Sequence, residues 1–383
     1  MKASSARPLP KFLKLAVATS PLVKQLTTFE FEGIQFDLLF YGLCILVVLL
    51  KPTTLFLRKP VALFLFACCS LIPSYLCGVQ HGIRVGIDLI SLWVLYAATM
   101  RLIEEGEAEN LFLLYVRASS VVAVWGIFEL IFGFTNSLGL DGFSFESSHY
   151  VVACAPAAYF ALASKTSSSF EKFILPLSLL LTFSATGLLV SVIIFATRIR
   201  RQLPVVLGLT VGLCLLWSWH EPMRQRVSLR LADIGLAWDY HNDDFGSNRT
   251  TASWVSNWSV ALSNVEEFFP FGIGYSNHAT GYDRFFENSS FENSVFYGTN
   301  SRSGHSLLFR FLSEFGALGA LLLSVTGFFA TRKVKAYDPL TKTVFWSCSA
   351  HLIGKSMKLG SYFDYGTPFF LCIMLIILVR DQR

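Results

Sequence analysis

The feature that most constrains this chain is the grouping of its apolar residues into long runs with short polar connections between them. A helix that crosses a bilayer needs about 20 mostly apolar residues. Such runs cover residues 34–50, 60–78, 82–100, 110–133, 149–164, 171–185, 186–198, 203–220, 305–330, 341–355 and 365–380. Charged residues make up only 15% of the chain, against about 25% in soluble domains. The sequence therefore predicts an all-α polytopic integral membrane protein with about 11–12 transmembrane helices.

The positions of Lys and Arg predict the orientation, because basic connections face the cytoplasm. The connections KPTTLFLRKP, SKTSSSFEK, TRIRRQ and TRKVK are basic, whereas GVQHG and residues 134–148 contain neither Lys nor Arg. The resulting alternation places residues 221–304 outside, as one large extracytoplasmic loop. It divides the chain into an N-terminal cytoplasmic or interfacial segment (1–33), a helical bundle (34–220), the loop (221–304) and C-terminal helices (305–383).

Two local features leave alternatives open. The basic N-terminus favours the cytoplasm but the alternation places it outside, and an interfacial or marginal extra span within residues 11–30 would resolve this conflict. The runs 171–185 and 186–198 are short and meet at SATG, so they form either two short helices or one broken helix.

Several function classes are not supported. The basic connections carry no interleaved aromatic stripe, so we expect no binding to nucleic acid. All eight cysteines lie in apolar segments, where they should act as small apolar residues. Asp239, His241, Asp243 and Asp244 resemble a metal cluster, but in a turn-rich segment we expect them to be solvated acids. We therefore expect no metal and no other cofactor.

The outer segment 221–304 contains six arginines, no lysine and ten acidic residues. A planar guanidinium binds phosphate oxygens in a fixed bidentate geometry, so these arginines could bind phosphate. They could equally form ordinary ion pairs with the acids. Tryptophans gather in and before this segment, which suits either stacking on sugar rings or an interfacial aromatic belt.

The strongest motif begins at His305-Ser306. Nine residues follow before Gly316, and two more before Gly319. This spacing resembles the H-[NSQ]-x9-G-x-x-[GTY] pattern of the O-antigen ligase and polymerase superfamily of bacterial envelopes. The segment RTTASWVSNWSVALSNVEEFFPFGIGYSN resembles that family's arginine, amphipathic helix and glycine-rich turn, with its matches at Arg249, residues 250–268, Pro270, Gly272 and Gly274.

Two further stretches extend this resemblance toward the N-terminus. GFSFESSHYVVACAP (142–156) resembles the family's EPSY-x-A stretch, and TFSATGLLVSV (182–192) resembles its SRxG helix. Together the matches cover most of residues 110–330, in the family's order.

The resemblance implies an enzyme that transfers a glycan from an undecaprenyl-diphosphate carrier to an acceptor hydroxyl at the periplasmic face of the bacterial inner membrane, without a metal. It favours a polymerase of lipid-linked oligosaccharide repeats, which forms O-antigen or exopolysaccharide. A ligase that delivers the glycan to lipid A-core or protein is the alternative, although the loop 134–148 lacks the arginine common in ligases. The implied partners are the lipid-linked oligosaccharide, the glycan acceptor and the bilayer, with a flippase and a chain-length regulator beside them.

A more distant alternative is a polysaccharide transporter or flippase that catalyses no glycan transfer. It predicts charges at mid-membrane and an inverted repeat, whereas the charges here gather toward the outer face.

The resemblance and the residue chemistry together suggest roles for individual side chains. His305 suits a general base because an imidazole has a pKa of roughly 6.5, although a histidine at a helix start can also act as a simple cap. Arg249 and Arg302 would hold the diphosphate, since fixed donors stabilise developing charge. The further candidates for binding substrate are Arg226, Arg230, Arg310, Glu146 and His149.

Arg310 and Glu314 lie four residues apart, so on a helix their side chains share one face. Their pairing would allow both charges to lie near a bilayer, although Arg310 could instead reach the phosphate. Gly316 and Gly319 should allow a close approach between helices.

Overall fold

The computed structural model describes residues 11–22, 28–31, 34–37, 108–132, 140, 147–182, 184, 187, 190–192, 194, 249–362 and 366–379. This part is predominantly helical, as predicted. Its α-helices are α1 (Lys11–Thr19), α6 (Ala108–Phe132), α7 (Ser147–Ala163), α8 (Ser169–Leu180), α12 (Arg249–Glu267), α13 (His278–Phe286), α14 (Leu307–Val334), α15 (Pro339–Met357) and α16 (Thr367–Val379). Short 3₁₀ turns occur at Ser20–Leu22 and Ser290–Asn293.

Six of the predicted apolar spans correspond to helices. The expected spans 110–133, 149–164, 171–185, 305–330, 341–355 and 365–380 coincide within a few residues with α6, α7, α8, α14, α15 and α16. Helix α8 ends before SATG, which confirms a break at that point. The spans 60–78, 82–100 and 203–220, and most of 186–198, lie outside the described residues.

Of the two alternatives left open for residues 11–30, the described residues argue against a spanning helix and leave the interfacial segment as an expectation. Residues 11–22 form the nine-residue helix α1 and a 3₁₀ turn, and the strand β1 (Thr28–Phe31) pairs antiparallel with β2 (Ile34–Asp37). Nine residues rise only about 14 Å as a helix, so α1 is too short to cross a bilayer. Because β2 covers residues 34–37, no helix over 34–50 can begin at residue 34.

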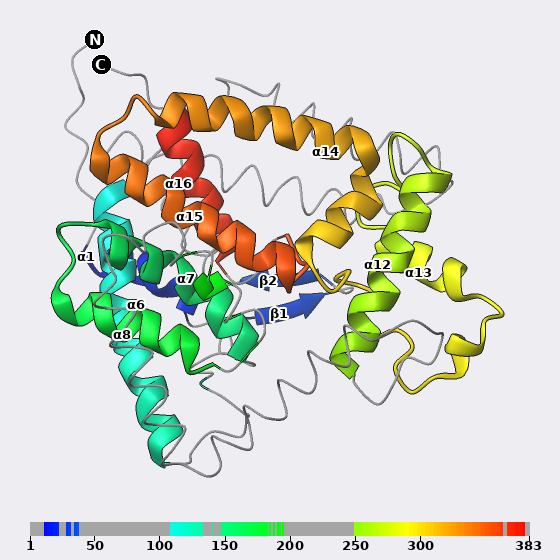
Figure 1. Cartoon of the computed structure of the whole chain (residues 1–383), viewed down its shortest axis with the longest axis horizontal. Helices are drawn as coiled ribbons and strands as arrows, with labels where there is room; N and C mark the ends of the chain where they lie inside the picture. Colours follow the sequence, from blue (N-terminus) through cyan, green and yellow to red (C-terminus); the bar gives the residue numbers. More distant parts are fainter. Residues whose placement is uncertain are drawn as a thin grey trace.

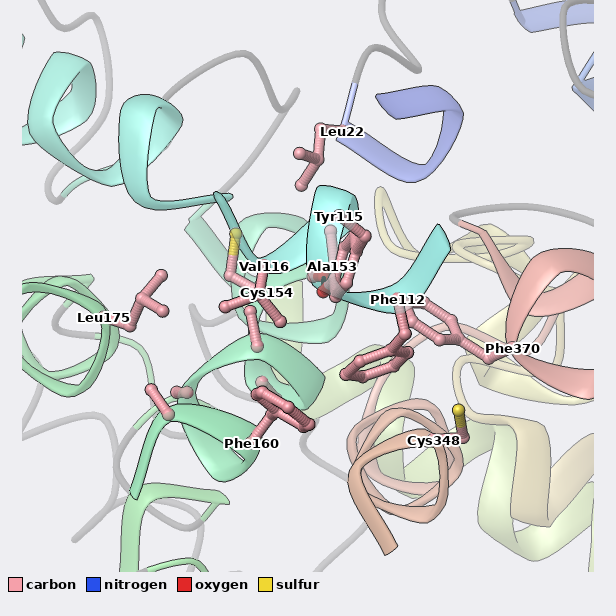
Figure 2. Close-up of a cluster of buried hydrophobic side chains, with 14 of the residues drawn as sticks. Leu22, Phe112, Tyr115, Val116, Ala153, Cys154, Phe160, Leu175, Cys348 and Phe370 are labelled. Carbon is pink, nitrogen blue, oxygen red and sulfur yellow. Dashed lines mark hydrogen bonds between the residues drawn. The ribbon is translucent and has the colours of Figure 1, made fainter. Parts of the chain in front are cut away.

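The main apolar core lies between α6, α7, α8, α15 and α16 (Figure 1). The buried Tyr115 of α6 donates its hydroxyl hydrogen to the carbonyl of Ala153 in α7, and its ring lies 5.2 Å from that of Phe370 in α16. Figure 2 shows Phe112 and Phe160 beside these residues. Cys154 and Cys348 are buried thiols of the same core, which confirms their predicted role as small apolar residues.

The described part of the expected outer loop is folded. Helix α12 packs along the start of α14, and α13 packs on α12 (Figure 1). A small second core forms from Val260, Tyr282, Phe286 and Phe291. The helical hairpin of α14 and α15 brings the start of α14 next to the residues that follow α15, since the Leu359 amide donates to the His305 carbonyl at 3.0 Å.

Two helices of the described part are long and apolar enough to cross a membrane, Glu109–Phe132 and Leu307–Val334. Both expose large apolar side chains. On α6 these include Val121, Trp125 and Ile131, and on α14 they include Leu321, Leu323 and Phe329. An open apolar hollow of about 400 Å³ lies between α6 and Phe170 of α8.

Candidate functional site

His305 lies where the folded outer segment meets the first turn of α14. The next residue, Ser306, is the N-cap of α14, and its hydroxyl accepts a hydrogen bond from the Phe309 amide at 3.1 Å. Serine and asparagine are among the best N-cap residues, which accounts for the second position of the His-Ser pattern. His305 itself has a φ of 59°, a left-handed conformation that turns the chain sharply into the helix.

The His305 side chain is only 4% exposed, and its Nδ1 lies 2.9 Å from the hydroxyl of Ser253 in α12. That hydroxyl donates to the Thr299 carbonyl at 3.1 Å and accepts from the Asn300 amide at 2.9 Å. A hydroxyl has one hydrogen and two lone pairs, so its remaining capacity is that of an acceptor. The Asn300 side-chain nitrogen, which can only donate, also lies 3.4 Å from Nδ1, a longer contact than the 2.9 Å to Ser253. With the Ser253 hydrogen directed at the Thr299 carbonyl, the shorter contact favours the hydrogen on Nδ1 of His305 and a lone pair on Nε2.

Burial lowers the pKa of His305 to about 3, and the nearby positive charge of Lys358 adds to the effect. The imidazole is therefore neutral at every physiological pH. Among the described residues no hydrogen-bond partner faces Nε2. The arrangement presents one neutral nitrogen lone pair, which can accept a proton.

The segment after α15 closes over His305. Gly360 lies so close that a Cβ there would overlap the Ser303 carbonyl, and Lys358 immediately precedes the Leu359 that bonds to His305. Lys355, in the last turn of α15, is fully buried and donates to Thr367 Oγ1 at 2.9 Å. Sequence reasoning missed both lysines, because it treated residues 341–355 as an apolar span and did not connect 355–362 with His305.

Arg310 and Glu314 form the predicted pair. The Arg310 Nε lies 2.8 Å from a Glu314 carboxylate oxygen, and both side chains are buried. The hydroxyl of Tyr362 donates to the other carboxylate oxygen at 3.0 Å, and the guanidinium lies over the Tyr362 ring. Arg310 also donates to the Gly360 carbonyl at 3.4 Å, so the pair joins α14 to the segment that closes over His305.

Gly316 interrupts α14 with φ 59° and ψ −157°, and the turn 270–274 inserts at that break. The amides of Ile273 and Gly274 donate to the carbonyls of residues 313 and 314 at 2.9 and 3.0 Å, and the Leu318 amide donates to the Pro270 carbonyl at 3.0 Å. The two glycine motifs found in the sequence thus contact each other. Close approach at Gly316 is confirmed, although the partner is a turn and not a helix.

Gly319 shows no close approach by another helix within the part of the chain that is described, so the expectation for it stays a prediction. A Cβ at Gly319 would meet Phe315 and Phe311 of its own helix. The nearest atoms therefore come from the preceding turn of α14, and a close approach by another helix is not seen there.

Arg249 and Arg302 are both exposed, and each lies close in sequence to a residue of the His305 site. Arg249 is the first residue of α12 and precedes Ser253 by four positions, so both lie on one helix face. Arg302 lies three residues before His305 in the turn that follows Asn300. Trp254 and Trp258 pack with their rings 5.3 and 5.1 Å from that of Phe309, so they serve at least to fix α12 on α14.

Of the remaining predicted residues, only His149 lies in the part of the chain that the structure describes. His149 is buried near the start of α7, and none of the hydrogen bonds around His305 involves it. Glu146, Arg226 and Arg230 lie outside the described residues.

A second histidine, His278 at the start of α13, was not predicted. It is 1% exposed, its Nε2 lies 3.0 Å from the Asn257 side-chain oxygen, and burial lowers its pKa to about 3. A signal for this contact was present in the sequence. Ser253, Asn257 and Asn264 recur at i, i+4 and i+11, which places uncharged polar groups on one face of α12.

The sequence matches no protein-family model, and no curated protein matches it significantly. The resemblance at Arg249, at the turn 270–274 and at the His305 pattern therefore depends on the residues themselves.

Proposed function

We propose that this chain is an integral membrane glycosyltransferase that polymerises undecaprenyl-diphosphate-linked oligosaccharide repeats at the periplasmic face of the bacterial inner membrane. The observation that carries the proposal is the neutral, fixed imidazole of His305 at the start of an apolar helix. The contact between the turn 270–274 and Gly316 supports it, because two motifs of the resemblance form one structural unit.

In the proposed reaction, the acceptor hydroxyl attacks the anomeric carbon of the glycan on its lipid diphosphate. A new glycosidic bond forms, the bond from the anomeric carbon to the diphosphate oxygen breaks, and the hydroxyl proton passes to Nε2 of His305. The free protein holds this nitrogen at low basicity, since burial disfavours the imidazolium. The negative charge of a bound diphosphate would raise the basicity of the imidazole when substrate arrives.

Cations at this end of the molecule suit the departing diphosphate. Arg249 and Arg302 are exposed and adjoin residues of the site in the sequence, and Lys358 lies close enough for its charge to act on His305. Arg310 is held by Glu314 and Tyr362, so we assign it a structural role. The exposed apolar surfaces of α6 and α14 suit a lipid environment, where a lipid-linked donor would be encountered.

The test uses His305→Asn in the host strain, with surface glycan resolved as a ladder and protein quantified in the membrane. Asparagine tolerates a positive φ, and its side-chain amide can replace Nδ1–H as donor to Ser253, so this variant should fold. We expect long chains to vanish while single repeats remain, and Arg249→Ala to shorten the ladder. Long chains that accumulate on the carrier lipid would instead indicate a ligase. An unchanged ladder would refute the catalytic assignment and favour a transporter.

A further inference from the structure

His278 and His305 come from separate segments, yet one chain of hydrogen bonds joins them. The amide nitrogen of Asn257 donates to the Ser253 carbonyl at 2.7 Å and to the Thr299 carbonyl at 3.2 Å. These two acceptors fix which end of the Asn257 amide is nitrogen. The oxygen end therefore faces His278, at 3.0 Å from its Nε2.

This orientation determines the protonation of His278. Because an amide oxygen only accepts, Nε2 of His278 must carry its hydrogen, and the lone pair lies on Nδ1. That Nδ1 is buried and has no hydrogen-bond partner among the described residues. Leaving a buried polar atom unpaired costs free energy, so His278 is a poor choice for packing alone.

The same hydrogen bonds extend to His305. Thr299 offers one carbonyl oxygen to both the Asn257 amide and the Ser253 hydroxyl. While the Ser253 hydrogen is directed at that carbonyl, the serine oxygen can only accept from Nδ1 of His305. If the serine rotated its hydrogen toward His305, the imidazole would carry its hydrogen on Nε2, where no acceptor lies among the described residues.

We propose that His278 is a positioning residue that acts through Asn257, Thr299 and Ser253 to keep the hydrogen of His305 on Nδ1 and its lone pair on Nε2. The inference deepens the proposed function, on which its catalytic consequence rests. His278 itself bonds to Asn257 on the polar face of α12 and does not contact the substrate in this scheme. Its contribution is to keep the base in the only tautomer that can accept the acceptor proton.

The direct readout is the tautomer of His305, observed by nitrogen NMR of histidine-labelled protein in detergent micelles. Protonated and unprotonated ring nitrogens give distinct resonances, and the chain has seven histidines to assign. The His305→Asn variant identifies the resonances of His305. In the wild type we expect Nδ1 to carry the hydrogen. This measurement needs no glycan transfer, so it can fail or succeed independently of the proposed activity.

Three variants then test the role of His278. His278→Leu removes the donor to Asn257 and should give a mixture of His305 tautomers, with kcat lowered about tenfold and KM for the lipid-linked donor little changed, as for other partners that orient a functional histidine. In His278→Gln the side-chain amide can donate from the position of Nε2 and should restore both readouts. Asn257→Asp loses both donated hydrogen bonds and should behave like His278→Leu.

The matched control is His351→Leu, because His351 is also fully buried but bonds to the Val152 carbonyl and to Thr367, outside this network. It should lower stability without changing the His305 tautomer. If His278→Leu leaves the tautomer and kcat unchanged, or if His351→Leu alters them equally, the positioning role is refuted. If the tautomer responds but His305→Asn retains full activity, the proposed function fails instead.

Discussion

The break in α14 at Gly316 makes a quantitative prediction for Gly272→Ala. A Cβ on Gly272 would lie 2.6 Å from both the Gly316 nitrogen and the Ser313 oxygen. Both are backbone atoms, so they cannot rotate away as the end of a side chain can. Gly272 also has a φ of 72°, where an L-residue is strained.

The two effects can be given magnitudes. The positive φ alone costs about 1–2 kcal/mol. Separation of the backbones would weaken the three hydrogen bonds that join the turn 270–274 to α14, each worth about 1 kcal/mol. We therefore expect Gly272→Ala to destabilise the protein by roughly 3–5 kcal/mol. The first turns of α14, which follow His305 and carry Arg310, lead directly to this break. A change in the break should displace them, so glycan polymerisation should fall as well.

Two control substitutions separate strain from contact. Gly298 has a φ of 71° with nothing near its Cβ position, so Gly298→Ala should cost only the strain, about 1–2 kcal/mol. Gly327 lies in α14 with open space around it and no strain, so Gly327→Ala should be neutral or up to about 1 kcal/mol more stable. The assay is the fraction of purified, detergent-solubilised protein that stays monodisperse after heating. If Gly272→Ala is no less stable than Gly298→Ala, the inserted turn does not support the helix as described.

Three further predictions concern the same region. Arg310→Met or Glu314→Gln alone should cost about 3–5 kcal/mol of stability, because each leaves a buried group uncompensated. Arg310→Met combined with Glu314→Leu should cost less than either single change. If the losses in heat stability were equal and additive, they would contradict the buried pair. Ser306→Ala should lower stability by about 1 kcal/mol while Ser306→Asn retains it, since asparagine also caps helices; a loss with both would contradict the N-cap role. The third prediction concerns pH. The pKa values of His278 and His305 are lowered to about 3 in the fold, so protonation favours the unfolded chain. Stability is then fully present above pH ~6.5 and falls by about 2 kcal/mol per histidine between pH 6.5 and 5. The double variant His278→Gln/His305→Asn should lose less on acidification, and a pH dependence equal to that of the wild type would refute the assignment.

Local patterns in the sequence predicted much of this structure. The apolar runs predicted six described helices because helix length and hydropathy are properties of one segment. The spacing of Arg310 and Glu314 predicted their pair for the same reason, since a helix alone brings residues i and i+4 together. The His305 pattern correctly indicated a helix start, which Ser306 now explains as an N-cap.

Contacts between distant segments could not be predicted in this way. Ser253 and His305 are 52 residues apart, and their contact depends on how α12 packs along α14. Lys358, in the segment after α15, approaches His305 only because α14 and α15 form an antiparallel hairpin. His278 follows the glycine-rich turn in the sequence, but its protonation depends on which end of the Asn257 amide faces it, and the sequence does not indicate this.

The catalytic role of His305 is tested most directly with purified protein in lipid nanodiscs and a synthetic undecaprenyl-diphosphate-linked oligosaccharide. The measurement is the release of undecaprenyl diphosphate together with the appearance of elongated lipid-linked glycan, for the wild type and for His305→Asn of equal heat stability. The account predicts that the wild type forms both products and that His305→Asn forms them at least about 100-fold more slowly, the usual contribution of a general base. Equal rates for the two proteins would contradict the central claim.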